Sequence, residues 1–134
     1  MTTGAPRSGD HVVRLPFASG AARAARDLLN RLLDHHGVSD ELRQDAALIV
    51  HELVVNAVLH GRPDDDEQIE FATWVESGEL VISVHDSGET GQVVVRPPSQ
   101  DAPNGRGLAI VDALSTRWSV DRSDGTRVSA HLDI

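Results

Sequence analysis

The sequence of 134 residues contains no cysteine and no lysine, so each of its 12 basic residues is an arginine. The lack of cysteine excludes disulfides, thiolate nucleophiles and zinc–sulfur sites. The lack of lysine excludes a P-loop lysine, a Schiff base and a serine–lysine dyad. A phosphate group bound by this chain must therefore be held by arginine, by backbone N–H groups or by a metal ion.

The chain also lacks a long apolar run and an excess of positive charge. No segment approaches the roughly twenty apolar residues of a membrane-spanning helix, and the polar residues 1–10 have no signal-peptide core. The net charge is −9, whereas a protein that binds duplex nucleic acid normally presents a basic face. We therefore expect a cytoplasmic protein that binds neither membrane nor nucleic acid, with residues 1–10 as a flexible tail.

Hydrophobic periodicity and turn residues predict a single domain over residues 11–134. The predicted strands span 11–17, 69–75, 80–85, 118–122 and 126–132, with a strand-like patch at 93–95. The predicted helices span 19–36, 39–60 and 108–114. This order predicts an α+β fold: a two-layer sandwich with helices on one face of a mixed, mostly antiparallel sheet. The acidic run at 64–67 is interpreted as a solvated loop, and the long loop 87–104 as functional or mobile.

The second helix ends with the segment Glu52-Leu-Val-Val-Asn56-Ala-Val-Leu-His60-Gly61. Residues 52, 56 and 60 are four apart, so they share one helix face at the edge of the apolar stripe. They are either boundary residues bonded to a neighbouring loop or groups that contact a ligand. A zinc-protease helix starting at His51 is excluded, because the second histidine would have to stand where Val55 is.

Two further segments bring polar or glycine residues to the ends of elements. Asp86-Ser-Gly88 follows an apolar strand, where a carboxylate can accept a hydrogen bond from a ligand that approaches the backbone. Residues 104–111, Asn-Gly-Arg-Gly-Leu-Ala-Ile-Val, open the third helix, whose free N–H groups and positive end favour an anion. Each segment alone is weak, since Asp-x-Gly is a common turn signal.

Together and in this order, the three segments resemble the N, G1 and G2 boxes of the GHKL ATPase superfamily. That superfamily includes gyrase-type ATPases, Hsp90, histidine kinases and MutL. The form of the boxes is most similar to the branch of anti-sigma-factor serine/threonine kinases, and the resemblance covers residues 11–134. It implies the Bergerat ATP-binding fold, with ATP and Mg²⁺ bound to a histidine-kinase-like domain.

The resemblance also implies roles for individual residues. Glu52 would be the general base, and Asn56 would give its amide oxygen to Mg²⁺, with Ala57 and His60 beside the nucleotide. Asp86 would accept the exocyclic amine of adenine. The other nucleotide-binding residues would be Gly88 and Thr126 at the base and Gly105, Arg106, Gly107 and Leu108 at the phosphates. One departure concerns the G1 box, which often continues Asp-x-Gly-x-Gly, whereas this chain has Thr90 followed by Gly91.

Three functions are compatible with these boxes. The first is an anti-sigma factor that binds a sigma factor and phosphorylates an anti-anti-sigma (STAS-type) partner, as a monomer or a homodimer. The second is a non-catalytic module in which ATP only switches a partner interface; the changed G1 box favours it. The third is a detached histidine-kinase catalytic domain, for which no phosphoacceptor helix pair precedes residue 11.

Overall fold

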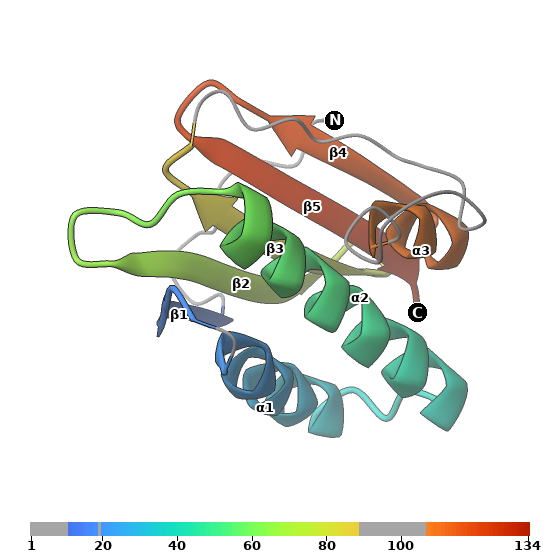
Figure 1. Ribbon diagram of the computed structural model, residues 1–134. Helices are drawn as coiled ribbons and strands as arrows, with labels where there is room; N and C mark the ends of the chain where they lie inside the picture. The colour runs from blue at the N-terminus through green and yellow to red at the C-terminus, as the bar shows by residue number, and fades with distance from the viewer. Residues whose placement is uncertain (1–10, 19, 89–106) are drawn as a thin grey trace.

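The computed structural model describes residues 11–18, 20–88 and 107–134, which form a sheet layer and a helix layer (Figure 1). The strands are β1 (His11–Pro16), β2 (Gln68–Glu76), β3 (Glu79–Asp86), β4 (Arg117–Asp121) and β5 (Thr126–Asp133). The helices are α1 (Ala21–Asp34), α2 (Asp40–His60) and α3 (Gly107–Leu114). Residues 1–10 and the strand-like patch at 93–95 lie outside the described residues.

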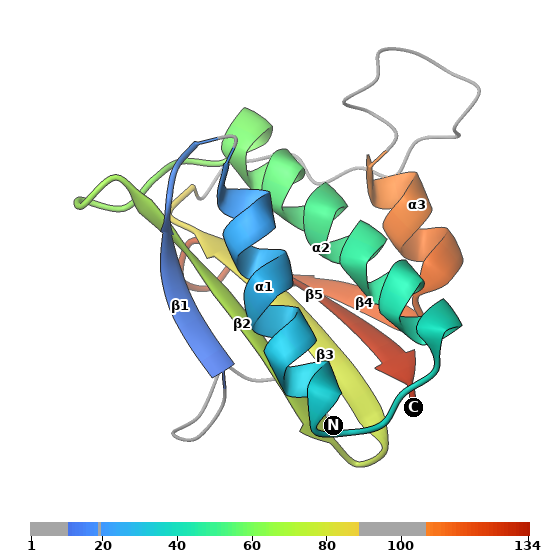
Figure 2. The ribbon, with the colours of Figure 1, turned by 90° about the horizontal axis from the view of Figure 1, so that it is seen from below.

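The strands form one sheet in the order β1-β2-β3-β5-β4. Each of the four described pairings is antiparallel, so the parallel pairing of a mixed sheet does not occur among these strands. The three helices cover one face of the sheet, with α2 between α1 and α3 (Figure 2). The predicted two-layer α+β sandwich is confirmed.

Helix α2 forms where the sequence predicts it and begins with a side-chain cap. The Ser39 hydroxyl oxygen accepts the Leu42 N–H at 3.1 Å, and two acidic residues occupy the first turn near the positive helix end. Its core face is spaced three and four residues apart and comprises Ala46, Ile49, Val50, Leu53, Val54 and Ala57. Among the described helices, none is both long and apolar enough to cross a bilayer.

Helix α1 is shorter than the predicted 19–36, because the chain turns at Gly37 with a left-handed φ of 59°. The two histidines before this glycine, His35 and His36, are exposed. The largest fully buried side chains join the two layers and include Leu29, Leu33, Ile49, Leu53, Phe71 and Ile82. This packing fixes where α2 lies over β3 and β5.

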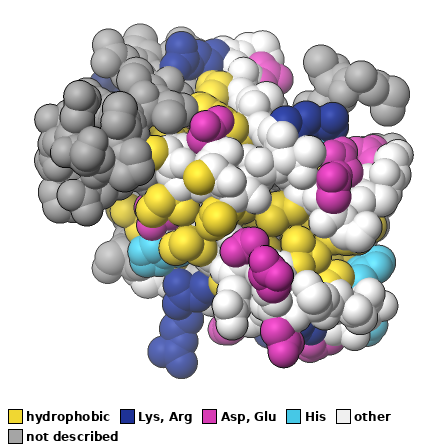
Figure 3. Space-filling view, turned by 90° about the vertical axis from the view of Figure 1, so that its right-hand side faces the viewer, with side chains coloured by type: hydrophobic (Ala, Val, Ile, Leu, Met, Phe, Trp, Pro, Cys, Tyr) yellow, Lys and Arg dark blue, Asp and Glu magenta, His cyan; other side chains and the backbone are white. Residues whose placement is uncertain are grey.

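A groove opens at one end of the molecule, between the turn that joins α1 to α2 and the end of β5. Its volume is about 690 Å³, and its lining includes Val38, Leu42, Glu41, Asp45 and Asp133. Figure 3 shows this end, the right-hand side of Figure 1, with apolar side chains gathered between acidic ones. The groove lies at the C-terminal end of β5, whereas Thr126 is the first residue of that strand. It is therefore separate from the site described next, which lies at the Thr126 end.

Candidate functional site

The centre of the candidate site is Asp86, the last residue of β3, which is only 7% exposed. Its Oδ1 atom accepts the Gly88 N–H at 2.7 Å and the Arg62 N–H at 3.2 Å. Burial raises the pKa of the Asp86 carboxyl above its ordinary value of 3.8, and the two backbone N–H donors partly offset that rise. The result is a buried carboxylate held in one orientation by the backbone.

Gly61 is the residue after α2. The space around it, and not its backbone conformation, requires a glycine at this position. Its φ of −89° and ψ of −166° are extended values that any residue adopts. A Cβ atom here would lie 2.5 Å from both Cγ and Oδ2 of Asp86 and 2.6 Å from the Ala57 carbonyl oxygen. The helix ends at this glycine as the sequence predicts, and the missing side chain also makes room for the Asp86 carboxylate.

At Gly125, in the turn before β5, both the backbone conformation and the lack of space require glycine. Its φ is +67°, and a Cβ atom would meet the Asp86 carbonyl oxygen and would lie 2.9 Å from Nε2 of His85. His85 Nε2 also donates to the Asp124 carbonyl oxygen at 2.5 Å, which ties this turn to β3. The end of β3 and the turn before β5 are therefore in close contact.

Thr126 lies directly opposite Asp86 in the β3–β5 ladder. It is buried, and its hydroxyl donates to the Gly88 carbonyl oxygen at 2.5 Å. The structure thus brings together Asp86, Gly88 and Thr126, which the sequence singled out from distant parts of the chain. Antiparallel pairing in this register accounts for the contact.

Glu52 and Asn56 lie on the flank of α2 that faces α3. The opposite flank faces α1. His51 Nδ1 lies 3.3 Å from Nη1 of Arg26 in α1, and Arg43 Nη2 donates to Oδ1 of Asp34, the last residue of α1, at 2.5 Å. At about 100° per residue, positions 52 and 56 point away from those contacts. Both side chains are half-buried, and neither has a partner among the described residues. Their predicted common face is confirmed, and the alternative of bonds to a neighbouring loop stays open for the residues outside the described ones.

The remaining sequence-predicted residues differ in what the structure says of them. Ala57 is buried, with its carbonyl oxygen accepting the Gly61 N–H at 2.8 Å, and His60 is exposed at the end of α2. Leu108 is buried in the core near the start of α3, which begins at Gly107. Gly105 and Arg106 lie outside the described residues.

Helix α3 directs its N-terminal end toward the end of the sheet where Asp86 lies. The residues after α3 meet the far end of β5, where Thr116 N–H donates to the His131 carbonyl oxygen at 2.7 Å. The C-terminal end of α3 is therefore remote from Asp86. Its N-terminal end points in the same direction as the C-terminal end of α2 (Figure 2). The positive end of this helix thus points toward the end of the sheet that holds Asp86.

Two contacts at and near the site were not evident from the sequence. The Arg62 N–H bond to Asp86 carries no sequence signal, because any residue except proline supplies a backbone N–H. Asp64, within the acidic run interpreted as solvated, is 23% exposed and pairs with Arg14 of β1. Its position directly after Pro63 is a turn signal that could have indicated a structural role.

The contacts of Gly61 predict that Gly61→Ala destabilises the protein by about 1–3 kcal/mol, the usual cost of overpacking. The obstructing atoms are a backbone oxygen and a carboxylate held by two hydrogen bonds, so neither can yield easily. Urea unfolding would measure the change. Gly20→Ala is the control, since its Cβ would meet nothing within 4 Å. Equal stability of the two variants would contradict the prediction.

The environment of Asp86 predicts that Asp86→Asn unfolds at a higher urea concentration than the wild type at neutral pH. An Asn oxygen accepts the same two backbone N–H bonds without the cost of a buried charge. Because the folded-state pKa is raised, the folded wild type binds a proton before the unfolded chain does. The wild type therefore gains stability as pH falls through the raised pKa, and the advantage of Asp86→Asn should shrink between that pKa and 3.8 and stay at its lower level below 3.8. An advantage that is independent of pH would refute this account.

Comparisons with known proteins agree with this geometry. Residues 15–132 match the family described as "Histidine kinase-like ATPase domain". No curated protein matches the chain. Among solved structures, the chain is similar to the crystal structure of the RsbU and RsbW domains of Rv1364c from Mycobacterium tuberculosis, with a TM-score of 0.70 and 23% identity.

The match to that structure covers 94% of this chain and 32% of the other. At this identity the likeness shows a shared fold, in agreement with the two-layer sandwich. The family match extends from β1 to β5 and includes all three boxes. The chain therefore belongs to the histidine kinase-like ATPase domain family.

Proposed function

We propose that this chain is an ATP- and magnesium-binding regulatory protein that phosphorylates a serine or threonine of a partner protein. The observation that carries the proposal is the Asp86 carboxylate, buried at a strand end and oriented by two backbone N–H groups. Around it, Gly61 and Gly88 carry no side chain that could block the approach of a ligand to the backbone. Such a site suits a flat group that donates a hydrogen bond.

The chemistry of this acceptor fits adenine better than guanine. A carboxylate only accepts hydrogen bonds, and the exocyclic amine of adenine only donates them. At the equivalent position guanine has a carbonyl oxygen, which a carboxylate repels. Asp86 would therefore select ATP over GTP, with Gly88 and Thr126 beside the base.

The residues of α2 fit the phosphate end of the nucleotide. Asn56 offers an amide oxygen, a hard ligand of the kind that Mg²⁺ prefers. The described residues hold no group of three or more His, Asp or Glu suited to a metal ion, so one protein oxygen and the phosphates would hold Mg²⁺. When bound, the ion neutralises phosphate charge. Gly105, Arg106, Gly107 and Leu108 would complete the phosphate site at the start of α3.

Glu52 is suited to act as the general base, one helical turn before Asn56. It is half-buried and has no partner among the described residues, so its carboxylate can accept a proton. In the transfer, the bond from the γ-phosphorus to the β,γ-bridging oxygen breaks and a bond to the acceptor hydroxyl oxygen forms. The hydroxyl proton goes to Glu52, and ADP leaves.

The acceptor is proposed to be an anti-anti-sigma (STAS-type) protein, with a cytoplasmic sigma factor as the second partner. The support is the form of the three boxes, which is most similar to that of the anti-sigma-factor kinases. The fold is also shared with 32% of the chain that contains the RsbU and RsbW domains of Rv1364c. A homodimer is compatible with β1, which is an edge strand of the sheet.

Nucleotide binding tests the first half of the proposal. Asp86→Asn should weaken ATP binding by about 1–3 kcal/mol, or roughly 5–150-fold, because it presents a donor to the adenine amine. Asn56→Ala should abolish the gain in ATP affinity that Mg²⁺ provides and leave metal-free binding unchanged. Calorimetry with ATP, ADP and GTP would measure both, with the exposed Asp27→Asn and Asn30→Ala as controls. Wild-type affinity in Asp86→Asn would remove this residue from the site.

Phosphoryl transfer tests the second half. Incubation of the protein with labelled ATP and a STAS-type partner should yield phosphoserine or phosphothreonine on the partner. Glu52→Gln should abolish the label and retain ATP binding, because it removes the proton acceptor and keeps the side-chain size. Glu41→Gln, exposed in the first turn of the same helix, is the matched control. ATP binding without label on any partner would favour the non-catalytic module instead.

A further inference from the structure

The loop between α2 and β2, residues 61–67, forms one wall of the Asp86 site. The Arg62 N–H donates to Asp86 Oδ1 at 3.2 Å, and the Ser87 N–H donates to the Arg62 carbonyl oxygen at 2.9 Å. The backbone of one loop residue thus holds both Asp86 and its successor. A displacement of Arg62 would therefore change the orientation of the Asp86 carboxylate.

Asp64 organises this loop from within. Its Oδ1 atom accepts the N–H groups of Asp66 at 2.8 Å and Gln68 at 2.9 Å. Its backbone N–H donates to the Gln68 carbonyl oxygen at 2.9 Å, and its carbonyl oxygen accepts the Glu67 N–H at 2.9 Å. Four backbone bonds in a loop of this length converge on one residue.

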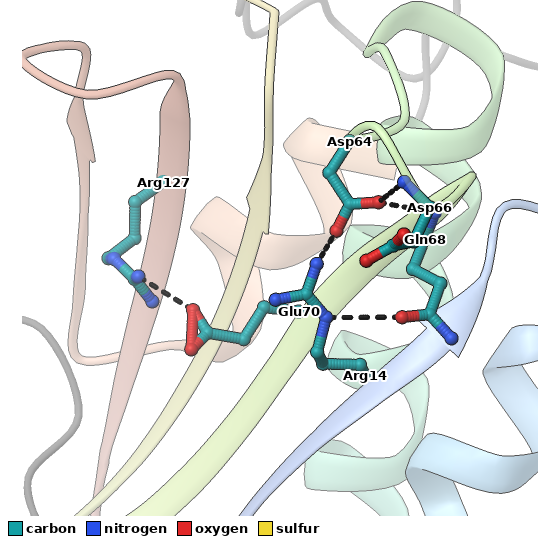
Figure 4. Close-up of polar contacts among 6 residues, drawn as sticks. All are labelled: Arg14, Asp64, Asp66, Gln68, Glu70 and Arg127. Carbon is teal, nitrogen blue, oxygen red and sulfur yellow. Dashed lines mark hydrogen bonds and ion pairs between the residues drawn. The ribbon is translucent and has the colours of Figure 1, made fainter.

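Arg14 clamps the same carboxylate from the neighbouring strand β1. Its guanidinium forms an ion pair with Asp64 Oδ2, and its Nε atom donates to Gln68 Oε1 at 3.1 Å (Figure 4). The Phe17 N–H adds a bond to the Glu67 carbonyl oxygen at 3.0 Å. The loop is therefore fastened to an edge strand as well as to itself.

Only Pro63 separates Asp64 from Arg62, and proline makes a stiff link. Its ring fixes its own φ and restricts the residue before it to extended conformations. Glu67, at the other end of the loop, has a left-handed φ of 60°, a strained value for a side-chain-bearing residue. Such strain persists only where surrounding contacts determine the backbone. The position of Asp64 thus determines the position of the Arg62 N–H.

We propose that Asp64, clamped by Arg14, is a positioning residue that sets the orientation of the Asp86 carboxylate through Pro63 and the Arg62 N–H. The consequence for ligands is selective recognition of the adenine amine, which rests on the proposed nucleotide-binding function. The next acidic residues of the run, Asp65 and Asp66, are exposed, and their side chains have no partner among the described residues. One carboxylate of the acidic run therefore has a role that the adjacent ones lack.

Four variants distinguish the contribution of the Asp64 hydrogen bonds within the loop from that of the ion pair with Arg14. Asp64→Ala removes the loop cap and the ion pair, whereas Asp64→Asn keeps an oxygen for the two N–H groups and loses the charge. Arg14→Gln removes only the clamp from β1. Asp65→Ala, with the same change of charge one residue away, is the matched control.

Calorimetric titration of the full chain with ATP and GTP is the first measurement. Asp64→Ala should lose ATP affinity by about tenfold, comparable to the loss of one hydrogen bond to a charged group. Its GTP affinity should not fall, because the Asp86 carboxylate repels the guanine carbonyl oxygen and makes no bond to it that could be lost. Asp64→Asn should recover most of the loss, Arg14→Gln should show an intermediate loss, and Asp65→Ala should match the wild type.

A second measurement needs no nucleotide and separates this proposal from the proposed function. The pKa of Asp86, followed by NMR, should rise in Asp64→Ala and in Arg14→Gln, because the Arg62 N–H bond that lowers it is weakened. This shift would support the link even if the wild type bound no ATP. An unchanged Asp86 pKa in Arg14→Gln would overturn it, even if Asp64→Ala did not fold. An equal effect of Asp65→Ala would also overturn it.

Discussion

A buried carboxylate at the end of a central strand is the constraint on which this structure depends. Burial of a charged group is unfavourable unless hydrogen bonds replace its lost hydration. At Asp86, two backbone N–H groups supply them, one from Gly88 and one from Arg62. Along the chain, Arg62 precedes β2 and Gly88 follows β3. Both segments must therefore be held in register for the carboxylate to keep one orientation.

Helix α2 links this carboxylate to the other polar groups of the site. Near its C-terminal end it presents Glu52 and Asn56 on the flank facing α3, and it stops at Gly61, where the carboxylate needs room. The same helix packs between α1 and α3 and against the sheet, so its position is fixed along most of its length. The rigidity of the site is thus a consequence of core packing.

Local sequence patterns were sufficient for the parts of the site that lie within one element. The i, i+4 spacing placed Glu52 and Asn56 on one face, and the apolar run of β3 placed Asp86 at a strand end. Two interpretations were incomplete for the same reason. Gly61 ends α2 as the sequence predicts, but its missing side chain also makes room for Asp86. Three residues of the acidic run 64–67 are exposed, whereas Asp64 is half-buried and pairs with Arg14. In both cases the decisive contact, with Asp86 and with Arg14, comes from a part of the chain remote in sequence.

The sequence by itself determined the element types, the α+β class and the three boxes, because periodicity and caps are local properties of the chain. The tertiary structure decided that Thr126 faces Asp86, that the Arg62 N–H reaches Asp86, and that β1 fastens the loop before β2. These contacts depend on strand order and register, and both follow from how the whole core packs. A backbone N–H is the same at almost every residue, so only its position in the fold can identify it as part of a site.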